Sequence, residues 1–220
     1  MSSPPKRSWQ QRLGYDLFRI VSQWVSVTLL DMRSLGRHHV PSNGGGLLLS
    51  SHQSHFDPVL VGLNCNRRLN YLARKTLFKN RLFAGIIRFL DAIEIDREGG
   101  GFGGLRETIA RLGRGELVLL FPEGTRSADG NIAELKSGFL VVAKRANVPL
   151  IPVAVIGAFD VLPRGTTLPR PHPVAVVFGK PIQPDEIATM DDATILKTIT
   201  ERMQECDRTG RSCLPVRCSP

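Results

Sequence analysis

The sequence predicts a single α/β domain with a mixed central sheet flanked by helices. Its 220 residues suit one domain with a single core. Short apolar runs alternate along the chain with segments of helical periodicity, which is the order of elements in α/β proteins. The sequence shows neither an internal repeat nor an internal linker. The fold class therefore follows from chain length, from the alternation of elements and from the lack of a dividing segment.

The first part of the chain combines a helical pattern with a short buried strand. Residues 8–31 carry apolar side chains at helical spacing and predict an amphipathic helix, which either lies on a bilayer or packs on the domain itself. A glycine-rich turn at 41–46 leads into the apolar run 47–50, which predicts a buried strand. Asp57 and Pro58 then favour the start of a helix that continues through Leu63.

The remaining chain continues the alternation. Strands are expected at 92–97, 117–121, 148–156 and 174–178, and helices at 105–112 and 135–146. A last helix is expected to begin at a capping box formed by Thr189 and Asp192 and to run through Met203. The chain is thus expected to divide into a disordered start (1–7), an amphipathic membrane-associating helix and linker (8–40), the main domain (41–206) and a disordered tail (207–220).

The charge balance restricts the class of partner. The formal net charge of +9 indicates attraction to nucleic acid, to an anionic lipid surface or to phosphorylated substrates. Nucleic acid is the least favoured, because no basic run alternates with aromatic residues as in a base-stacking platform. The basic segment 67–88 is interleaved with apolar residues and contains no acidic residue. This segment and residues 8–31 predict a peripheral or monotopic position at the cytoplasmic face of a membrane.

The cysteines and histidines do not predict a metal site or a disulfide framework. The four cysteines show no CxxC spacing, and three of them fall in the last fifteen residues. Free thiols in a reducing compartment fit this distribution better. His52 and His55 resemble a pair of metal ligands, but no third ligand follows at a convincing spacing. We therefore expect no metal and no cofactor.

Two polar clusters directly follow apolar runs and carry the candidate chemistry. His52 and Asp57 lie in the stretch Ser51–Pro58, and a histidine held by an aspartate can act as a base that deprotonates a hydroxyl group. The geometry expected is His52 in the loop and Asp57 in the first turn of the helix, with the two side chains converging across the bend. The second cluster, Phe121–Ser127, follows the apolar run 117–120. Two such clusters at strand ends predict an active site.

Four ordered segments resemble the motifs of the glycerolipid acyltransferase family, and most of all its 1-acyl-glycerol-3-phosphate acyltransferase group. They are His52-(x4)-Asp57, Ile93–Arg97, Phe121–Ser127 and Val148–Val153, with a looser match at Phe178–Ile182. The third segment is a full match. The resemblance implies transfer of an acyl chain from acyl-CoA or acyl-carrier protein to the free hydroxyl of a lysophospholipid, without a covalent acyl-enzyme.

The resemblance also implies the roles of individual residues. His52 is the general base and Asp57 its orienter. Arg97 and Arg126 are expected to bind the phosphate of the acceptor, because a guanidinium group offers forked donors. Glu123 is expected to accept a hydrogen bond from a glycerol hydroxyl, and Gly124 to let the backbone come close. The substrate-binding set is Lys75, Arg97, Glu123, Gly124, Thr125 and Arg126, with Lys136 as a weaker candidate for the phosphate.

Departures from the family motifs leave the acceptor open. Ser51 stands where asparagine is usual, His55 occupies a slot often held by an aromatic or small residue, and Asp91 and Glu94 replace a customary glycine and phenylalanine. Another lyso-acceptor, such as a lyso-ornithine lipid, is the alternative within the same chemistry.

Two alternatives come from other classes of protein. The run Gly99–Gly104 formally satisfies GxGxxG and would fit a nicotinamide-dependent oxidoreductase, although three charged or polar positions separate it from the preceding apolar strand. A catalytically silent lipid-binding protein is the other alternative. The presence of both His52 and Asp57 argues against it.

Overall fold

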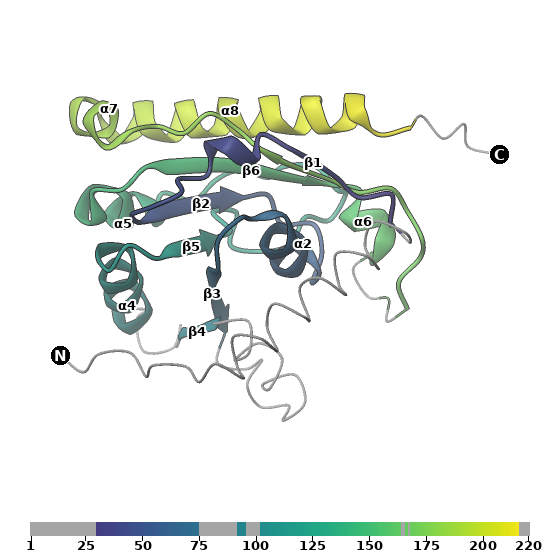
Figure 1. The fold of residues 1–220 in the computed structure, drawn as a ribbon, viewed down its shortest axis with the longest axis horizontal. Coiled ribbons are helices and arrows are strands. Elements are labelled where there is room, and N and C mark those ends of the chain that lie inside the picture. Colours follow the sequence, from purple (N-terminus) through teal and green to yellow (C-terminus); the bar gives the residue numbers. More distant parts are fainter. Residues whose placement is uncertain (1–29, 75–91, 96–101, 164–165, 167, 216–220) are drawn as a thin grey trace.

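The computed structural model describes residues 30–74, 92–95, 102–163, 166 and 168–215, and a seven-stranded sheet is the centre of this part of the chain (Figure 1). The strand order is β1-β7-β6-β2-β5-β3-β4. Adjacent strands are parallel except for β6 and β7, which are antiparallel. The predicted α/β class with a mixed sheet is therefore confirmed. The strands are β1 (Arg33–Leu35), β2 (Gly46–Ser50), β3 (Leu69–Arg74), β4 (Ala92–Ile95), β5 (Leu117–Leu120), β6 (Leu150–Ile156) and β7 (Ala175–Phe178).

Helices cover both faces of the sheet. One face packs against α2 (Asp57–Asn64) and α6 (Ala158–Val161). The other packs against α4 (Phe102–Gly113), α5 (Phe139–Ala146), α7 (Pro184–Thr189) and α8 (Asp192–Cys213). Figure 1 shows α8 and α2 on opposite sides of the sheet, and a short 3-10 helix, η1 (Arg37–His39), follows β1.

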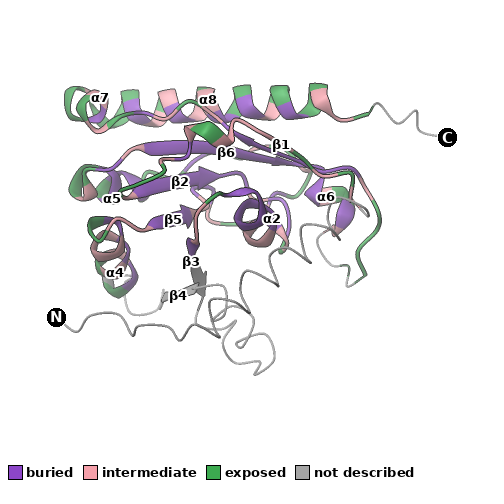
Figure 2. Cartoon of the chain, in the orientation of Figure 1, coloured by how far each residue is buried: buried purple, intermediate pink, exposed green. Residues whose placement is uncertain are grey.

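The cover of helices on both faces of the sheet explains why β2 is a continuous run of leucines. Leu48 belongs to the core on the α2 side, whereas Leu47 and Leu49 belong to the core on the α5 and α8 side. Successive side chains of a strand point to opposite faces, so a strand covered on both sides must be apolar at every position. All three leucines are fully buried, and β2 is drawn in the buried colour in Figure 2.

The topology places a switch point at the carboxyl end of β2. This strand lies between β5 and β6 and is parallel to both, so the carboxyl ends of all three meet at one edge of the sheet. The connection through α2 leaves β2 along one face, and the connection from β5 to β6 through α5 crosses the other face. A parallel sheet whose connections diverge in this way forms its ligand crevice at that edge.

The prediction of a disordered tail from residue 207 is wrong for residues 207–213, because α8 continues to Cys213. Its buried stripe of Ile199, Met203, Cys206 and Gly210 keeps helical spacing. A side chain at Gly210 would come within 2.3 Å of Ile156 Cδ1, so this glycine permits close packing of helix on sheet. The composition of residues 207–213 favours a loop, but the packing of α8 on the sheet stabilises a helix there.

Other boundaries also differ from the sequence expectations. The 8–40 segment was expected to end in a linker, but β1 pairs with β7 as an edge strand of the sheet. The last helix is capped by Asp191, whose side chain accepts a hydrogen bond from Thr194 N at 2.8 Å, so the predicted capping box of Thr189 and Asp192 is wrong. Strand β3 was not anticipated at all. The amphipathic helix expected at 8–31 lies outside the described residues except at its end.

Among the residues that the structure describes, no helix is both long enough and apolar enough to cross a membrane.

Candidate active site

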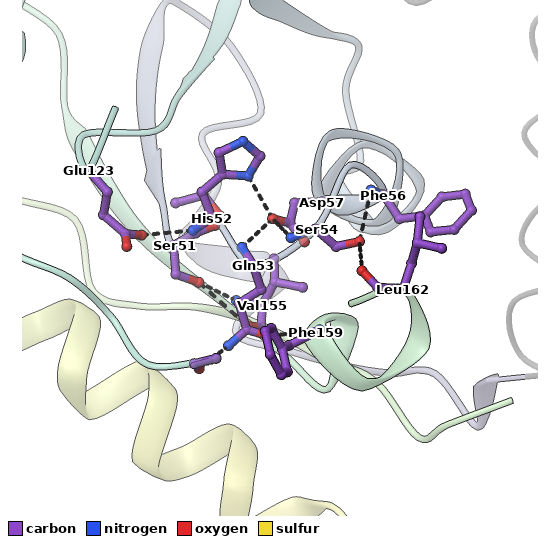
Figure 3. A network of polar contacts seen from close by, with 12 residues as sticks. Ser51, His52, Gln53, Ser54, Phe56, Asp57, Glu123, Val155, Phe159 and Leu162 are labelled. Carbon is purple, nitrogen blue, oxygen red and sulfur yellow. Dashed lines mark hydrogen bonds and ion pairs between the residues drawn. The ribbon is translucent and has the colours of Figure 1, made fainter. Parts of the chain in front are cut away.

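His52 and Asp57 converge at the carboxyl end of β2, as the sequence predicts. His52 leaves the end of β2, Asp57 begins α2, and His52 Nδ1 lies 2.8 Å from Asp57 Oδ2 (Figure 3). A carboxylate only accepts, so Nδ1 carries the hydrogen and Nε2 keeps its lone pair. The His52 side chain is 19% exposed, whereas the Asp57 side chain is fully buried. The imidazole can therefore be reached from solvent while the carboxyl group cannot.

Asp57 is held by donors from its own loop. Its Oδ2 also accepts from Gln53 N at 2.6 Å and from Ser54 N at 2.8 Å. Burial raises the pKa of Asp57 above the ordinary value, and the hydrogen bonds from His52, Ser54 and Gln53 oppose that shift. Its other oxygen, Oδ1, is buried without a hydrogen-bond partner among the described residues. The carboxyl group is thus directed at the imidazole with little freedom to turn.

The second polar cluster lies against the first. The register places Leu49 beside Leu120, so residues 51–53 and 121–123 leave the sheet next to each other. The Phe121 ring stacks on the His52 ring, with the centroids 4.0 Å apart and an interplanar angle of 22°. Glu123 Oε1 accepts from His52 N at 2.8 Å, and Ser127 N donates to His52 O at 2.7 Å. The sequence motif contained Phe121 and Ser127 but gave neither a role.

Ser51 and Gln53 fix the loop that carries His52. Ser51 Oγ accepts from Val155 N at 2.9 Å, and Gln53 Nε2 donates to Gly130 O at 2.6 Å. Ser51 is buried and bonded to the neighbouring strand β6. The departure from asparagine at Ser51 therefore concerns the support of the loop, and its side chain is turned away from the space in front of His52.

Gly124 lies beneath a lysine side chain. Its backbone has a positive φ of 73°, which favours glycine, and a Cβ there would lie 3.2 Å from Lys136 Nζ. Lys136 N donates to Pro122 O at 2.9 Å, so the two segments are also joined through the backbone. The structure thus brings Lys136, the weaker phosphate candidate from sequence, directly to the Phe121–Ser127 cluster.

Thr125, Arg126 and His55 lie at the accessible side of the site. Thr125 and His55 are exposed, and Arg126 is half-buried. The pKa of His55 is lowered, first by partial burial and then by the positive charges of Arg126 and His52. Arg126 and Lys136 form no ion pair with another described residue, which leaves two cations available to an anionic ligand near His52.

Several expected site residues lie outside the described part of the chain. These are Lys75, Arg97, Asp91 and most of the basic segment 67–88, and their roles stay predictions. The run Gly99–Gly104 is described only from residue 102, where α4 begins and Gly103 and Gly104 form part of its first turn. Within the described residues, no group of three His, Cys, Asp or Glu side chains is arranged to hold a metal ion.

Comparisons with known proteins give a consistent assignment. Residues 31–156, more than half of the chain, match the model of the family described as Acyltransferase. The 1-acyl-sn-glycerol-3-phosphate acyltransferase of Bacillus subtilis (strain 168) is 25% identical over 170 residues, covering 77% of this chain and 82% of the relative. The Streptococcus pneumoniae enzyme of the same name is 30% identical over 160 residues, covering 72% and 57%.

A solved structure shares the fold. The crystal structure of the 1-acyl-sn-glycerophosphate (LPA) acyltransferase PlsC from Thermotoga maritima matches with a TM-score of 0.79, covering 97% of this chain and 86% of that chain at 22% sequence identity.

The fold and the family match together define an acyltransferase, with a histidine–aspartate pair at the carboxyl edge of its sheet. The chain belongs to the Acyltransferase family, and its resemblance to the 1-acyl-glycerol-3-phosphate acyltransferase group is confirmed.

Proposed function

We propose that the protein transfers a fatty acyl chain to the free hydroxyl of 1-acyl-glycerol-3-phosphate and so produces phosphatidate. The observation that carries the proposal is the hydrogen bond from His52 Nδ1 to a buried carboxylate, which leaves Nε2 free to accept a proton. The relatives named for this acceptor support the choice of substrate. The donor is an acyl thioester of CoA or of acyl-carrier protein.

The reaction needs no nucleophile from the protein. His52 Nε2 takes the proton of the acceptor hydroxyl as its oxygen attacks the thioester carbonyl carbon. The tetrahedral intermediate collapses with release of the thiolate, which takes the proton back from the imidazolium. Asp57 keeps the ring in the required tautomer and stabilises its charged form. Each turnover yields one ester and one free thiol, and His52 returns to its starting state.

A panel of acceptors tests the proposed substrate. Thiol release is measured with acyl-CoA and with acyl-carrier protein, each offered 1-acyl-glycerol-3-phosphate, glycerol-3-phosphate, a lyso-ornithine lipid or monoacylglycerol. Preferred turnover of 1-acyl-glycerol-3-phosphate supports the proposal. Preferred turnover of the lyso-ornithine lipid would transfer the same chemistry to another acceptor.

Arg126 is proposed to bind the phosphate of the acceptor, with Lys136 beside it. Arg126→Gln is expected to weaken the apparent binding of the lysophospholipid, raising its KM about 10- to 100-fold, the usual value of a hydrogen bond to a charged group. The KM for monoacylglycerol, which lacks phosphate, should not change. Steady-state kinetics with both acceptors measures the difference, and an equal rise for both would place Arg126 outside the phosphate site.

We further propose a peripheral position at the cytoplasmic face of a membrane, because the lipid substrate resides in the bilayer and the chain carries a net charge of +9. The full chain is expected to float with vesicles that contain anionic lipid and to dissociate at about 1 M salt, where charges are screened within about 3 Å. Neutral vesicles are the control. Flotation that is indifferent to lipid charge and salt would point instead to apolar insertion.

A further inference from the structure

Glu123 is the most enclosed charged side chain of the Phe121–Ser127 cluster. It is 3% exposed, and both of its oxygens accept backbone hydrogen bonds, Oε1 from His52 N at 2.8 Å and Oε2 from Ala133 N at 2.9 Å. Figure 3 shows the carboxyl group directed at the backbone of His52 from the side opposite to Asp57. Burial raises the pKa of Glu123, and the two backbone donors oppose that shift. A substrate hydroxyl would have to compete for oxygens that already have partners.

The contacts of Glu123 belong to a set that surrounds His52. The peptide N–H of His52 is held by Glu123, its carbonyl by Ser127 N, and its ring by Asp57 and Phe121. Within the described part of the chain, Glu123 supplies the only side-chain acceptor for this peptide N–H. Its second bond, to Ala133, connects the base to the segment in which Leu135 is buried in the core on the α5 side. The position of the base is thus fixed to the core of the domain.

The neighbours of Glu123 differ from it in this respect. Thr125 and Lys136 are exposed and Arg126 is half-buried, so these residues can contact a ligand. Glu123 is buried behind them, at the base of the turn that contains Gly124. The cluster therefore separates into side chains that face the substrate space and one carboxylate that faces the protein.

We infer that Glu123 is a positioning residue, which acts on the reaction through the backbone of His52 rather than by binding a hydroxyl of the acceptor. The inference rests on the proposed function for the reaction that His52 catalyses. Reactive groups must be placed within a fraction of an ångström, and a shift of about 1 Å can cost about 10²-fold in rate. Loss of the hydrogen bond from His52 N to Glu123 frees the His52 peptide group to move, whereas the residues that bind the acceptor stay in place.

Kinetics separate the two roles. Glu123→Ala is expected to lower kcat by about 10²-fold, while the KM for the lysophospholipid acceptor changes little. Glu123→Gln keeps a carbonyl oxygen for His52 N and is expected to lose less. Glu134→Gln, a change at an exposed carboxylate two residues before Lys136, is the matched control and should behave as wild type. A raised KM with unchanged kcat for the Glu123 variants would overturn the inference in favour of substrate binding.

A double-mutant comparison tests whether the effect passes through His52. In a His52→Ala background, adding Glu123→Ala should leave the residual rate unchanged, because no base remains to be positioned. A further fall by a factor similar to that in wild type would overturn the inference. Thermal unfolding shows whether Glu123→Ala is folded. If it is not, the kcat and KM of Glu123→Gln distinguish positioning from substrate binding.

A measurement without turnover distinguishes this inference from the proposed function. The ring ¹⁵N signals of His52 are expected to move in Glu123→Ala and to stay in place in Glu134→Gln. Unchanged ring signals would overturn the positioning role even if the enzyme acylates 1-acyl-glycerol-3-phosphate. Conversely, a wild-type protein that turns over no lysophospholipid would refute the proposed function, while shifted ring signals would still support the contact between Glu123 and the His52 loop.

Discussion

Replacing Asp57 with asparagine is expected to lower kcat by about 10³- to 10⁴-fold and to leave a protein that is more stable than wild type at neutral pH. The loss of rate follows from the hydrogen bond between His52 Nδ1 and Asp57 Oδ2. In the variant the amide oxygen takes the place of Oδ2, because Gln53 N and Ser54 N also donate there. The neutral amide no longer stabilises the imidazolium that forms when His52 takes the proton of the acceptor hydroxyl.

The gain in stability follows from the sign of the pKa shift. Burial raises the pKa of Asp57 in the folded protein. A raised carboxyl pKa contributes stability that is fully present below the unfolded value, about 3.9, and is lost as pH rises through the folded value. At pH 7 the wild-type protein therefore carries the cost of a buried charge, and the asparagine variant does not. The buried Asp57 carboxylate is therefore expected to lower the stability of the folded protein at neutral pH.

Calorimetry across pH measures this difference. The Tm of Asp57→Asn should exceed that of wild type at pH 7, and the difference should shrink as pH falls from the folded pKa of Asp57 towards about 4, below which it should change no further. Asp160→Asn, a change at an exposed carboxylate on α6, is a control for removal of one negative charge. An asparagine variant that is less stable than wild type at every pH would show that the hydrogen bonds to Oδ2 outweigh the cost of burial.

The sequence was sufficient for the parts of the site that depend on local order. The leucines of β2 predict a strand buried on both faces, and the short spacing from His52 to Asp57 brings the pair together across one bend. It was not sufficient for β1 and β3, since a three-residue polar edge strand and a strand with an asparagine in it carry weak patterns. Their pairing is decided by neighbours that are distant in sequence.

The orientation of side chains was also beyond the sequence pattern. The motif places Glu123, Gly124 and Arg126 together, but spacing does not reveal that the glutamate turns to the protein and the arginine to the accessible side. Similarly, nothing in the spacing places Lys136 over Gly124, because this contact depends on how residues 131–138 return to the turn. In both cases long-range backbone hydrogen bonds decide the role of a residue.

Removal of the base itself is the most direct test of the reaction. His52→Ala is expected to lower kcat by about 10²- to 10⁴-fold, while the KM for either substrate changes little, because the imidazole acts on the proton of the acceptor and the binding groups remain. Thiol release in the presence of the lysophospholipid acceptor measures the rate. His38→Ala, which removes an exposed histidine from η1, is the matched control.

Added imidazole makes the same variant a test of mechanism. The substitution leaves a space between the Phe121 ring and Asp57 Oδ2, where a free imidazole can stack and donate as the side chain did. Imidazole is therefore expected to restore part of the activity of His52→Ala, and to restore none when Asp57→Asn is also present. Activity of His52→Ala at the wild-type rate, without imidazole, would show that another group deprotonates the acceptor and that the pair at the end of β2 has a structural role.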